Sequence, residues 1–79
     1  MEGAEQMYKK KLLEIYNGTL TKNDFSNEFK IYGNNKVMTI LDNFEIILSE
    51  FECSDEAIEK IIEITNNSII AEIKKYEGA

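Results

Sequence analysis

The sequence contains no histidine, proline, tryptophan or arginine, and it has a single cysteine. The absence of histidine removes the commonest general base and the commonest metal ligand. The lone Cys53 lies among acidic residues, with no adjacent cation to stabilise a thiolate, so it is interpreted as a packing residue rather than a nucleophile. These absences predict a protein that is not an enzyme and has no catalytic residues.

Metal and cofactor sites are also not indicated. A zinc site needs several Cys or His ligands, and the alternating acidic ligands of an EF-hand loop do not occur around Asp42 or Asp55. The glycines at positions 3, 18, 33 and 78 stand alone, so there is no glycine-rich loop to hold a phosphate. No metal ion and no cofactor are therefore expected.

The cellular setting is predicted from two further absences. No apolar run approaches the roughly 18 residues that a membrane span requires. One cysteine cannot form an internal disulfide, and small secreted domains usually depend on several. A cytoplasmic protein without a membrane partner is the expectation.

Chain length and hydrophobic periodicity predict the fold. The 79 residues are enough for one domain, 1–79, and 43% of them are hydrophobic, as in globular proteins. In residues 35–52 the apolar positions recur every three or four residues, which is the period of an amphipathic helix. The members of this core-facing stripe are Val37, Ile40, Leu41, Phe44, Ile47, Leu48 and Phe51.

Three other segments show the same period, at residues 4–16, 22–32 and 55–76. Their boundaries are marked by capping residues: Thr21 before the second helix, Asn34 and Asn35 before the third, and Ser54 before the fourth. Four amphipathic helices with short turns predict an all-α fold, a small four-helix up-and-down bundle.

Acidic charge is concentrated in the second half of the chain. The net charge is −6; residues 1–41 hold six Lys and five acids, whereas residues 42–79 hold three Lys and ten acids. Such a balance disfavours direct binding of nucleic acid and favours a basic protein partner, which would relieve the repulsion between like charges. Ile46 is expected to be an apolar anchor within the acidic face. The predicted partner-binding residues are Asp42, Glu45, Ile46, Glu50, Glu52, Asp55, Glu56, Glu59 and Glu63.

The segment 12–29, LLEIYNGTLTKNDFSNEF, resembles the opening of the bacterial self-protective colicin-like immunity proteins of the colicin-D type. The resemblance lies in a helix, a short turn and a second helix with two phenylalanines four residues apart. The matching residues are Gly18, Leu20, Thr21, Phe25 and Phe29. Members of this family are small helical bundles that bind a cognate nuclease toxin and block its basic active-site groove with acidic residues.

The leading hypothesis is therefore a small acidic inhibitor of a basic nucleic-acid-processing protein, in particular an immunity protein that neutralises a nuclease. Two alternatives remain open. A phage anti-CRISPR inhibitor of a Cas effector would have the same acidity without sharing a motif. A helical interaction module would instead dimerise through an apolar helix face, so the chain is expected to be a monomer or a weak homodimer.

Overall fold

A computed structural model describes residues 2–31 and 33–77, and these residues form four α-helices. The helices are α1 (Glu2–Tyr16), α2 (Lys22–Glu28), α3 (Asn35–Glu50) and α4 (Asp55–Glu77). The prediction of a small all-α four-helix bundle is thus confirmed for the described residues.

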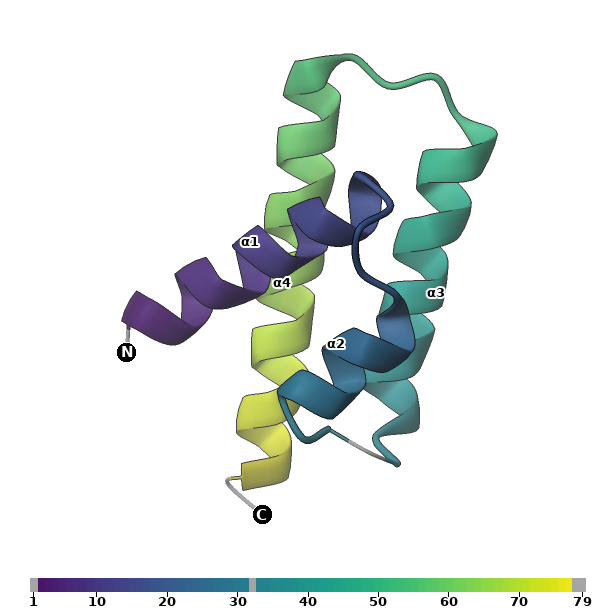
Figure 1. The fold of residues 1–79 in the computed structure, drawn as a ribbon. Coiled ribbons are helices and arrows are strands. Elements are labelled where there is room, and N and C mark those ends of the chain that lie inside the picture. Colours follow the sequence, from purple (N-terminus) through teal and green to yellow (C-terminus); the bar gives the residue numbers. More distant parts are fainter. Residues whose placement is uncertain (1, 32, 78–79) are drawn as a thin grey trace.

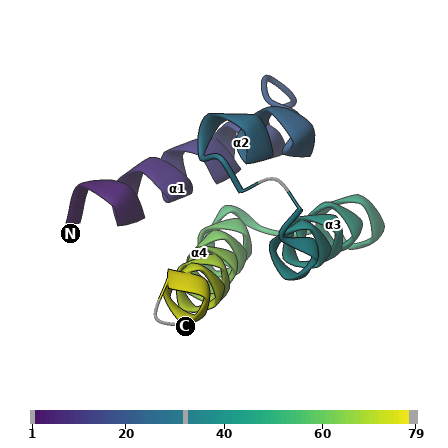
Figure 2. The ribbon, with the colours of Figure 1, turned by 90° about the horizontal axis from the view of Figure 1, so that it is seen from below.

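The helices lie in two layers. The long helices α3 and α4 run antiparallel in one layer, and α1 and α2 lie in the other (Figures 1 and 2). In the view of Figure 1, α1 crosses α4 at a steep angle, and α2 packs against the first half of α3. Because α3 and α4 are antiparallel, their connection lies at the end of the molecule opposite the C-terminal end of α4 (Figure 1).

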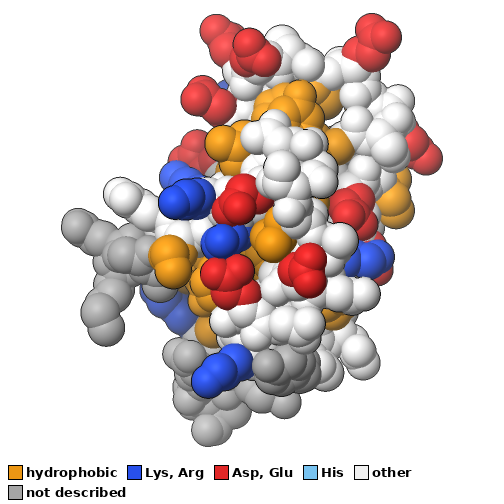
Figure 3. All heavy atoms as spheres, viewed as in Figure 1, with side chains coloured by type: hydrophobic (Ala, Val, Ile, Leu, Met, Phe, Trp, Pro, Cys, Tyr) orange, Lys and Arg blue, Asp and Glu red, His pale blue; other side chains and the backbone are white. Residues whose placement is uncertain are grey.

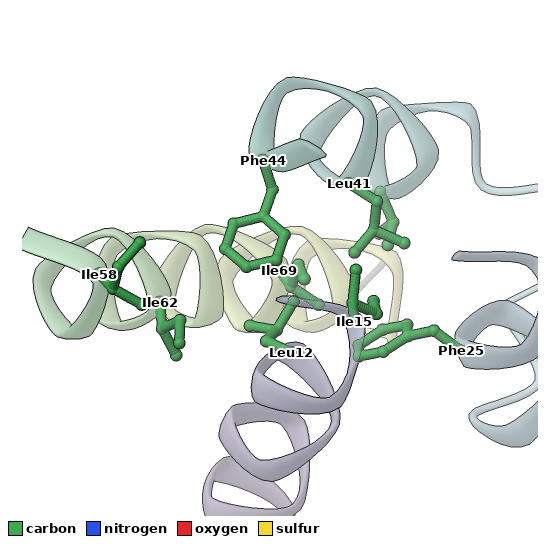
Figure 4. Close-up of a cluster of buried hydrophobic side chains, with 9 residues drawn as sticks. Leu12, Ile15, Phe25, Leu41, Phe44, Ile58, Ile62 and Ile69 are labelled. Carbon is green, nitrogen blue, oxygen red and sulfur yellow. The ribbon is translucent and has the colours of Figure 1, made fainter. Parts of the chain in front are cut away.

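The hydrophobic core draws side chains from all four of these helices. Leu12 of α1, Phe25 of α2, Leu41 of α3 and Ile69 of α4 each have an exposed fraction of 0%. In Figure 4, Leu41 and Phe44 point from α3 toward the layer that holds Leu12 and Phe25. The complete cluster comprises Leu12, Ile15, Phe25, Val37, Leu41, Phe44, Ile58, Ile62 and Ile69.

Aromatic rings join α1 to α2. The ring of Tyr8 lies 4.6 Å from that of Phe29 in an edge-on arrangement and 6.1 Å from that of Phe25, centroid to centroid. An ion pair between Lys11 Nζ and Glu28 Oε1, 3.4 Å apart, links the same two helices. Phe25 of α2 and Phe29, which directly follows α2, thus hold this segment on α1.

The predicted helix caps are confirmed. Thr21 Oγ1 accepts a hydrogen bond from the Asp24 amide, and an Asp24 carboxylate oxygen accepts one from the Thr21 amide, so the two residues form a capping box. Asn34 Oδ1 caps α3 by accepting from the Val37 amide, and Ser54 Oγ caps α4 by accepting from the Ala57 amide.

Two residues of the stripe predicted for the core are instead exposed. Ile47 has an exposed fraction of 36% and Phe51 one of 63%, and α3 ends at Glu50 rather than at residue 52. Because α2 packs on the first half of α3, the last turns of α3 have no helix of the second layer above them (Figure 1). The second helix, expected over residues 22–32, ends at Glu28, with Phe29 as its C-cap and Lys30 at a positive φ of 55°. Tyr32 lies outside the described residues.

A polar side chain in the middle of α4 is almost completely buried. Asn66, in the middle of α4, has an exposed fraction of 1%, and its Oδ1 has no hydrogen-bond partner among the described residues. The neighbouring Asn67 is exposed. A buried carbonyl oxygen without a partner destabilises the fold, because it has lost its hydrogen bonds to water.

Candidate functional site

The structure divides the predicted partner-binding residues between two places. Asp42, Glu45 and Ile46 lie on α3, where Lys22 of α2 approaches them. Lys22 Nζ donates a hydrogen bond to Asp42 Oδ1 and lies 3.7 Å from Glu45 Oε1. The hydrogen bond with Asp42 is the main reason why the pKa of Lys22 is raised above its ordinary value. Two of the predicted acids are therefore already paired within the fold.

A shallow hollow surrounds this ion pair. It has a volume of about 450 Å³, and Ile46, 49% exposed, forms its apolar part beside Ser49. We call it the Lys22 hollow, lined by Lys22, Asp42, Glu45, Ile46 and Ser49. Its lysine offsets part of the acidic charge, so this region is less suited to a cationic partner than the sequence indicated.

The other six predicted acids are exposed at the end of the molecule where α3 connects to α4, and along the first half of α4. Among the described side chains, none of the six takes part in an ion pair. We call this group the acidic edge, which consists of Glu50, Glu52, Asp55, Glu56, Glu59 and Glu63. Figure 3 shows acidic side chains gathered at this end, with hydrophobic surface between them.

Local structure explains why the acids on α4 lie in a row. The Ser54 cap sets the start of α4, and Asp55, Glu59 and Glu63 follow at intervals of four residues, which places them on one face of the helix. Asp55 and Glu56 in the first turn complement the positive end of the helix dipole. Glu59 and Glu63 lie beyond this first turn. The cation nearest to them in α4 is the exposed Lys60, and no ion pair joins it to either carboxylate among the described side chains.

A cleft of about 660 Å³ separates this row from α1. Its α1 wall carries Lys9 and Lys10, and its α4 wall carries Asp55, Glu59 and Glu63. Four hydrophobic residues line the floor between the two walls: Leu13, Tyr16, Ile58 and Ile62. The cleft thus combines an apolar floor with one basic and one acidic wall, and we call it the α1–α4 cleft.

Sequence reasoning missed the contribution of α1 to this cleft. The apolar period of residues 4–16 predicts a helix, but it does not indicate that Lys9, Lys10 and Tyr16 line a cleft. In the structure Leu13 and Tyr16 are 45% and 43% exposed. The available signal was the apolar Leu13 beside the Leu12 and Ile15 stripe, because a second apolar position widens the hydrophobic face beyond what the core covers.

Cys53 lies in the connection between α3 and α4. Its thiol is half-buried, packs against the hydrophobic core and lies 3.6 Å from the carbonyl oxygen of Phe51. Within residues 2–31 and 33–77, no three Cys, Asp or Glu side chains come close enough together to hold a metal ion.

Comparisons with known proteins do not assign the chain to a class: no family model, no curated protein and no solved structure matches it. None of the helices in the described part of the chain is both long enough and apolar enough to span a lipid bilayer.

Proposed function

We propose that this protein is a non-enzymatic inhibitor that binds a basic nucleic-acid-processing protein through its acidic edge. The partner class that fits best is a nuclease toxin, which would make the chain an immunity protein. The single observation that supports this most strongly is the group of six exposed carboxylates that have no ion pair among the described side chains.

The physical argument follows from the charge left uncompensated. Like charges four residues apart on a helix destabilise it by a few tenths of a kcal/mol for each pair, as for Glu59 with Glu63. A cationic surface would remove this repulsion on binding and would also accelerate the encounter by electrostatic steering. A nuclease groove that binds phosphates presents such a cationic surface.

Two alternative functions can be distinguished by experiment. A phage inhibitor of a nucleic-acid-guided nuclease would use the same acidic edge against the same kind of groove, so the identity of the captured partner separates it from an immunity protein. A dimerising module is favoured by a different observation, the exposed apolar Leu13, Tyr16 and Phe51. Sedimentation equilibrium tests it, because a monomer at about tens of micromolar excludes dimerisation as the main role.

The test begins with capture from a lysate of the source organism, washed at low and then at high salt, with the bound proteins identified by mass spectrometry. The captured protein is then purified, and its nuclease activity is measured with and without an equimolar amount of this chain. We expect a basic nuclease that is released by salt and inhibited by the chain. A captured nuclease that retains full activity in the complex would show that the inhibitor hypothesis is wrong.

Two double variants with the same net charge make this test specific. Glu52→Gln with Glu56→Gln removes two charges from the acidic edge. Asn23→Lys with Thr39→Lys changes the net charge equally at exposed positions outside the acidic edge, on α2 and in the first half of α3. We expect the first variant to slow association by about tenfold at low salt and the second to leave the rate within about twofold. Equal effects of the two variants would indicate that only the net charge matters.

A further inference from the structure

The α1–α4 cleft has an open apolar floor. Leu13 and Tyr16 keep 45% and 43% of their surface exposed, while Ile58 and Ile62 below them are 6% and 7% exposed. The buried isoleucines belong to the core and hold the floor in place. Leu13 and Tyr16 therefore form an apolar surface that the fold supports and does not cover.

The two walls of the cleft specify the charge of an occupant. Asp55, Glu59 and Glu63 recur at each turn of α4, about 6 Å apart along a wall about 12 Å long. A row of lysines or arginines with the same period would face them. Lys9 and Lys10 on the other wall favour an occupant whose opposite side is neutral or acidic. The occupant consequently has an apolar ridge with cationic residues along one side.

The backbone of the occupant must also be accommodated. An extended segment would place unpaired amide and carbonyl groups against the apolar floor, and the described residues contain no strand whose edge could pair with them. A helix satisfies these groups internally and presents side chains with the period of the α4 wall. Helix-in-groove binding is therefore the mode that this cleft fits.

We propose that the α1–α4 cleft binds a short amphipathic helix of the protein partner. One apolar side chain of that helix lies on Leu13 and Tyr16, and its lysines or arginines face Asp55, Glu59 and Glu63. The proposal rests on the proposed function, because it names the element of the basic partner that the acidic edge receives. A second copy of this chain is a poorer occupant, because the net charge of −6 on each copy makes the two repel one another.

The probe is a synthetic amphipathic helix of about 14 residues, roughly 21 Å long, with leucines on one face and lysines along one flank. Two control peptides separate the contributions: one has serines in place of the leucines, and the other has glutamates in place of the lysines. Binding is measured by fluorescence anisotropy, and amide chemical shifts locate the site. We expect the probe with both leucines and lysines to bind and the two control peptides not to bind. The chemical shift changes should lie in residues 9–16 and 55–63.

Matched variants of the intact chain test the floor and the wall separately. Leu13→Ser should raise the Kd for the peptide by about tenfold, whereas Ile64→Ser, at a residue 62% exposed on α4 outside the cleft, should leave it within about twofold. Glu59→Lys with Glu63→Lys should have an effect of similar size. A matched charge change, Glu50→Lys with Glu52→Lys, should have a much smaller one. The helical circular dichroism signal of each variant shows whether it is folded. If Leu13→Ser is unfolded, Tyr16→Ser is used in its place.

Several results would overturn the proposal. Shifts confined to the Lys22 hollow or to the α3–α4 connection would place the peptide elsewhere, and equal binding of the leucine and serine peptides would leave only nonspecific charge attraction. Dimerisation that Leu13→Ser abolishes would assign the cleft to a second copy. A captured partner that is lost with Glu52→Gln and Glu56→Gln but binds normally to Leu13→Ser would contradict the cleft and leave the proposed function standing.

Discussion

The buried Asn66 offers a direct test of how polar burial affects this fold. Its side chain has an exposed fraction of 1%, and Oδ1 has no hydrogen-bond partner among the described residues. Asn66→Leu replaces the amide by a branched apolar group with the same number of non-hydrogen atoms. It therefore removes the unpaired carbonyl and leaves little empty volume.

The magnitude follows from two contributions. A buried polar group left without a partner destabilises a protein by about 1–3 kcal/mol, and this penalty disappears in the leucine variant. Leucine also has a better helix propensity than asparagine, by roughly 0.5 kcal/mol. We expect Asn66→Leu to raise the free energy of unfolding by about 1.5–3.5 kcal/mol. In a domain of this size that corresponds to an increase in Tm of at least about 6 °C.

The assay is urea denaturation followed by circular dichroism, with Asn67→Leu as the matched control. Asn67 is the next residue of α4 and is exposed, so its replacement changes helix propensity by the same amount without removing a buried polar group. The control should raise the free energy of unfolding by only about 0.5 kcal/mol. An Asn66→Leu variant no more stable than the Asn67→Leu variant would refute the reasoning, because Asn66 would then have a compensating partner.

A second substitution at the same position checks the sign. Asn66→Asp buries a carboxyl group in place of the amide and should destabilise the fold by several kcal/mol at neutral pH. Burial raises the pKa of such a carboxyl in the folded state. The destabilisation should therefore diminish as the pH falls toward the pKa of an unfolded aspartate. A loss of stability that does not depend on pH would point to steric misfit instead.

Three further predictions concern local structure. Thr21→Ala removes the cap of α2 and should lower the free energy of unfolding by about 1 kcal/mol in urea denaturation, whereas Asn23→Ala, exposed on the same helix, should leave it nearly unchanged. Lys30 has a φ of 55°, a conformation that disfavours a residue with a Cβ. Lys30→Gly should therefore raise the free energy of unfolding by about 1 kcal/mol, and a decrease would contradict this interpretation. Lys22→Met breaks the ion pair with Asp42 and should lower the Tm near neutral pH. Because the folded pKa of Lys22 is raised, the pair stabilises the protein below the ordinary lysine pKa, and this contribution is lost as the pH rises through the folded value. The Tm values of the Lys22→Met variant and the parent should therefore converge at high pH.

Local signals in the sequence predict most of the fold. Thr21, Asn34 and Ser54 cap the helices that they were expected to cap, since capping depends on residues within one helical turn. In α1 and α4 the apolar period coincides with the buried Leu12, Ile15, Ile58, Ile62 and Ile69, although Tyr16 of α1 is 43% exposed. These features could be predicted because they depend only on neighbouring residues.

Features that depend on how far the helices of one layer extend over the other layer could not be predicted from neighbouring residues. Periodicity places Ile47 and Phe51 on the core face of α3, yet it does not say how far α2 extends along that face. The ion pair between Lys22 and Asp42 likewise arises only when α2 packs on α3. The sequence therefore indicated an acidic face but not its division into a paired region and an unpaired edge.

The steep crossing of α1 over α4 also links ligand binding to global stability. Residues that line the α1–α4 cleft come from the N-terminal helix and from the C-terminal helix, so neither segment alone presents both walls. A ligand held between them binds the folded chain and not the unfolded one, and at a concentration 100 times its Kd it would add about 2.7 kcal/mol to the free energy of unfolding. Occupancy of the cleft should thus protect even remote amides, such as those of α3, from hydrogen exchange.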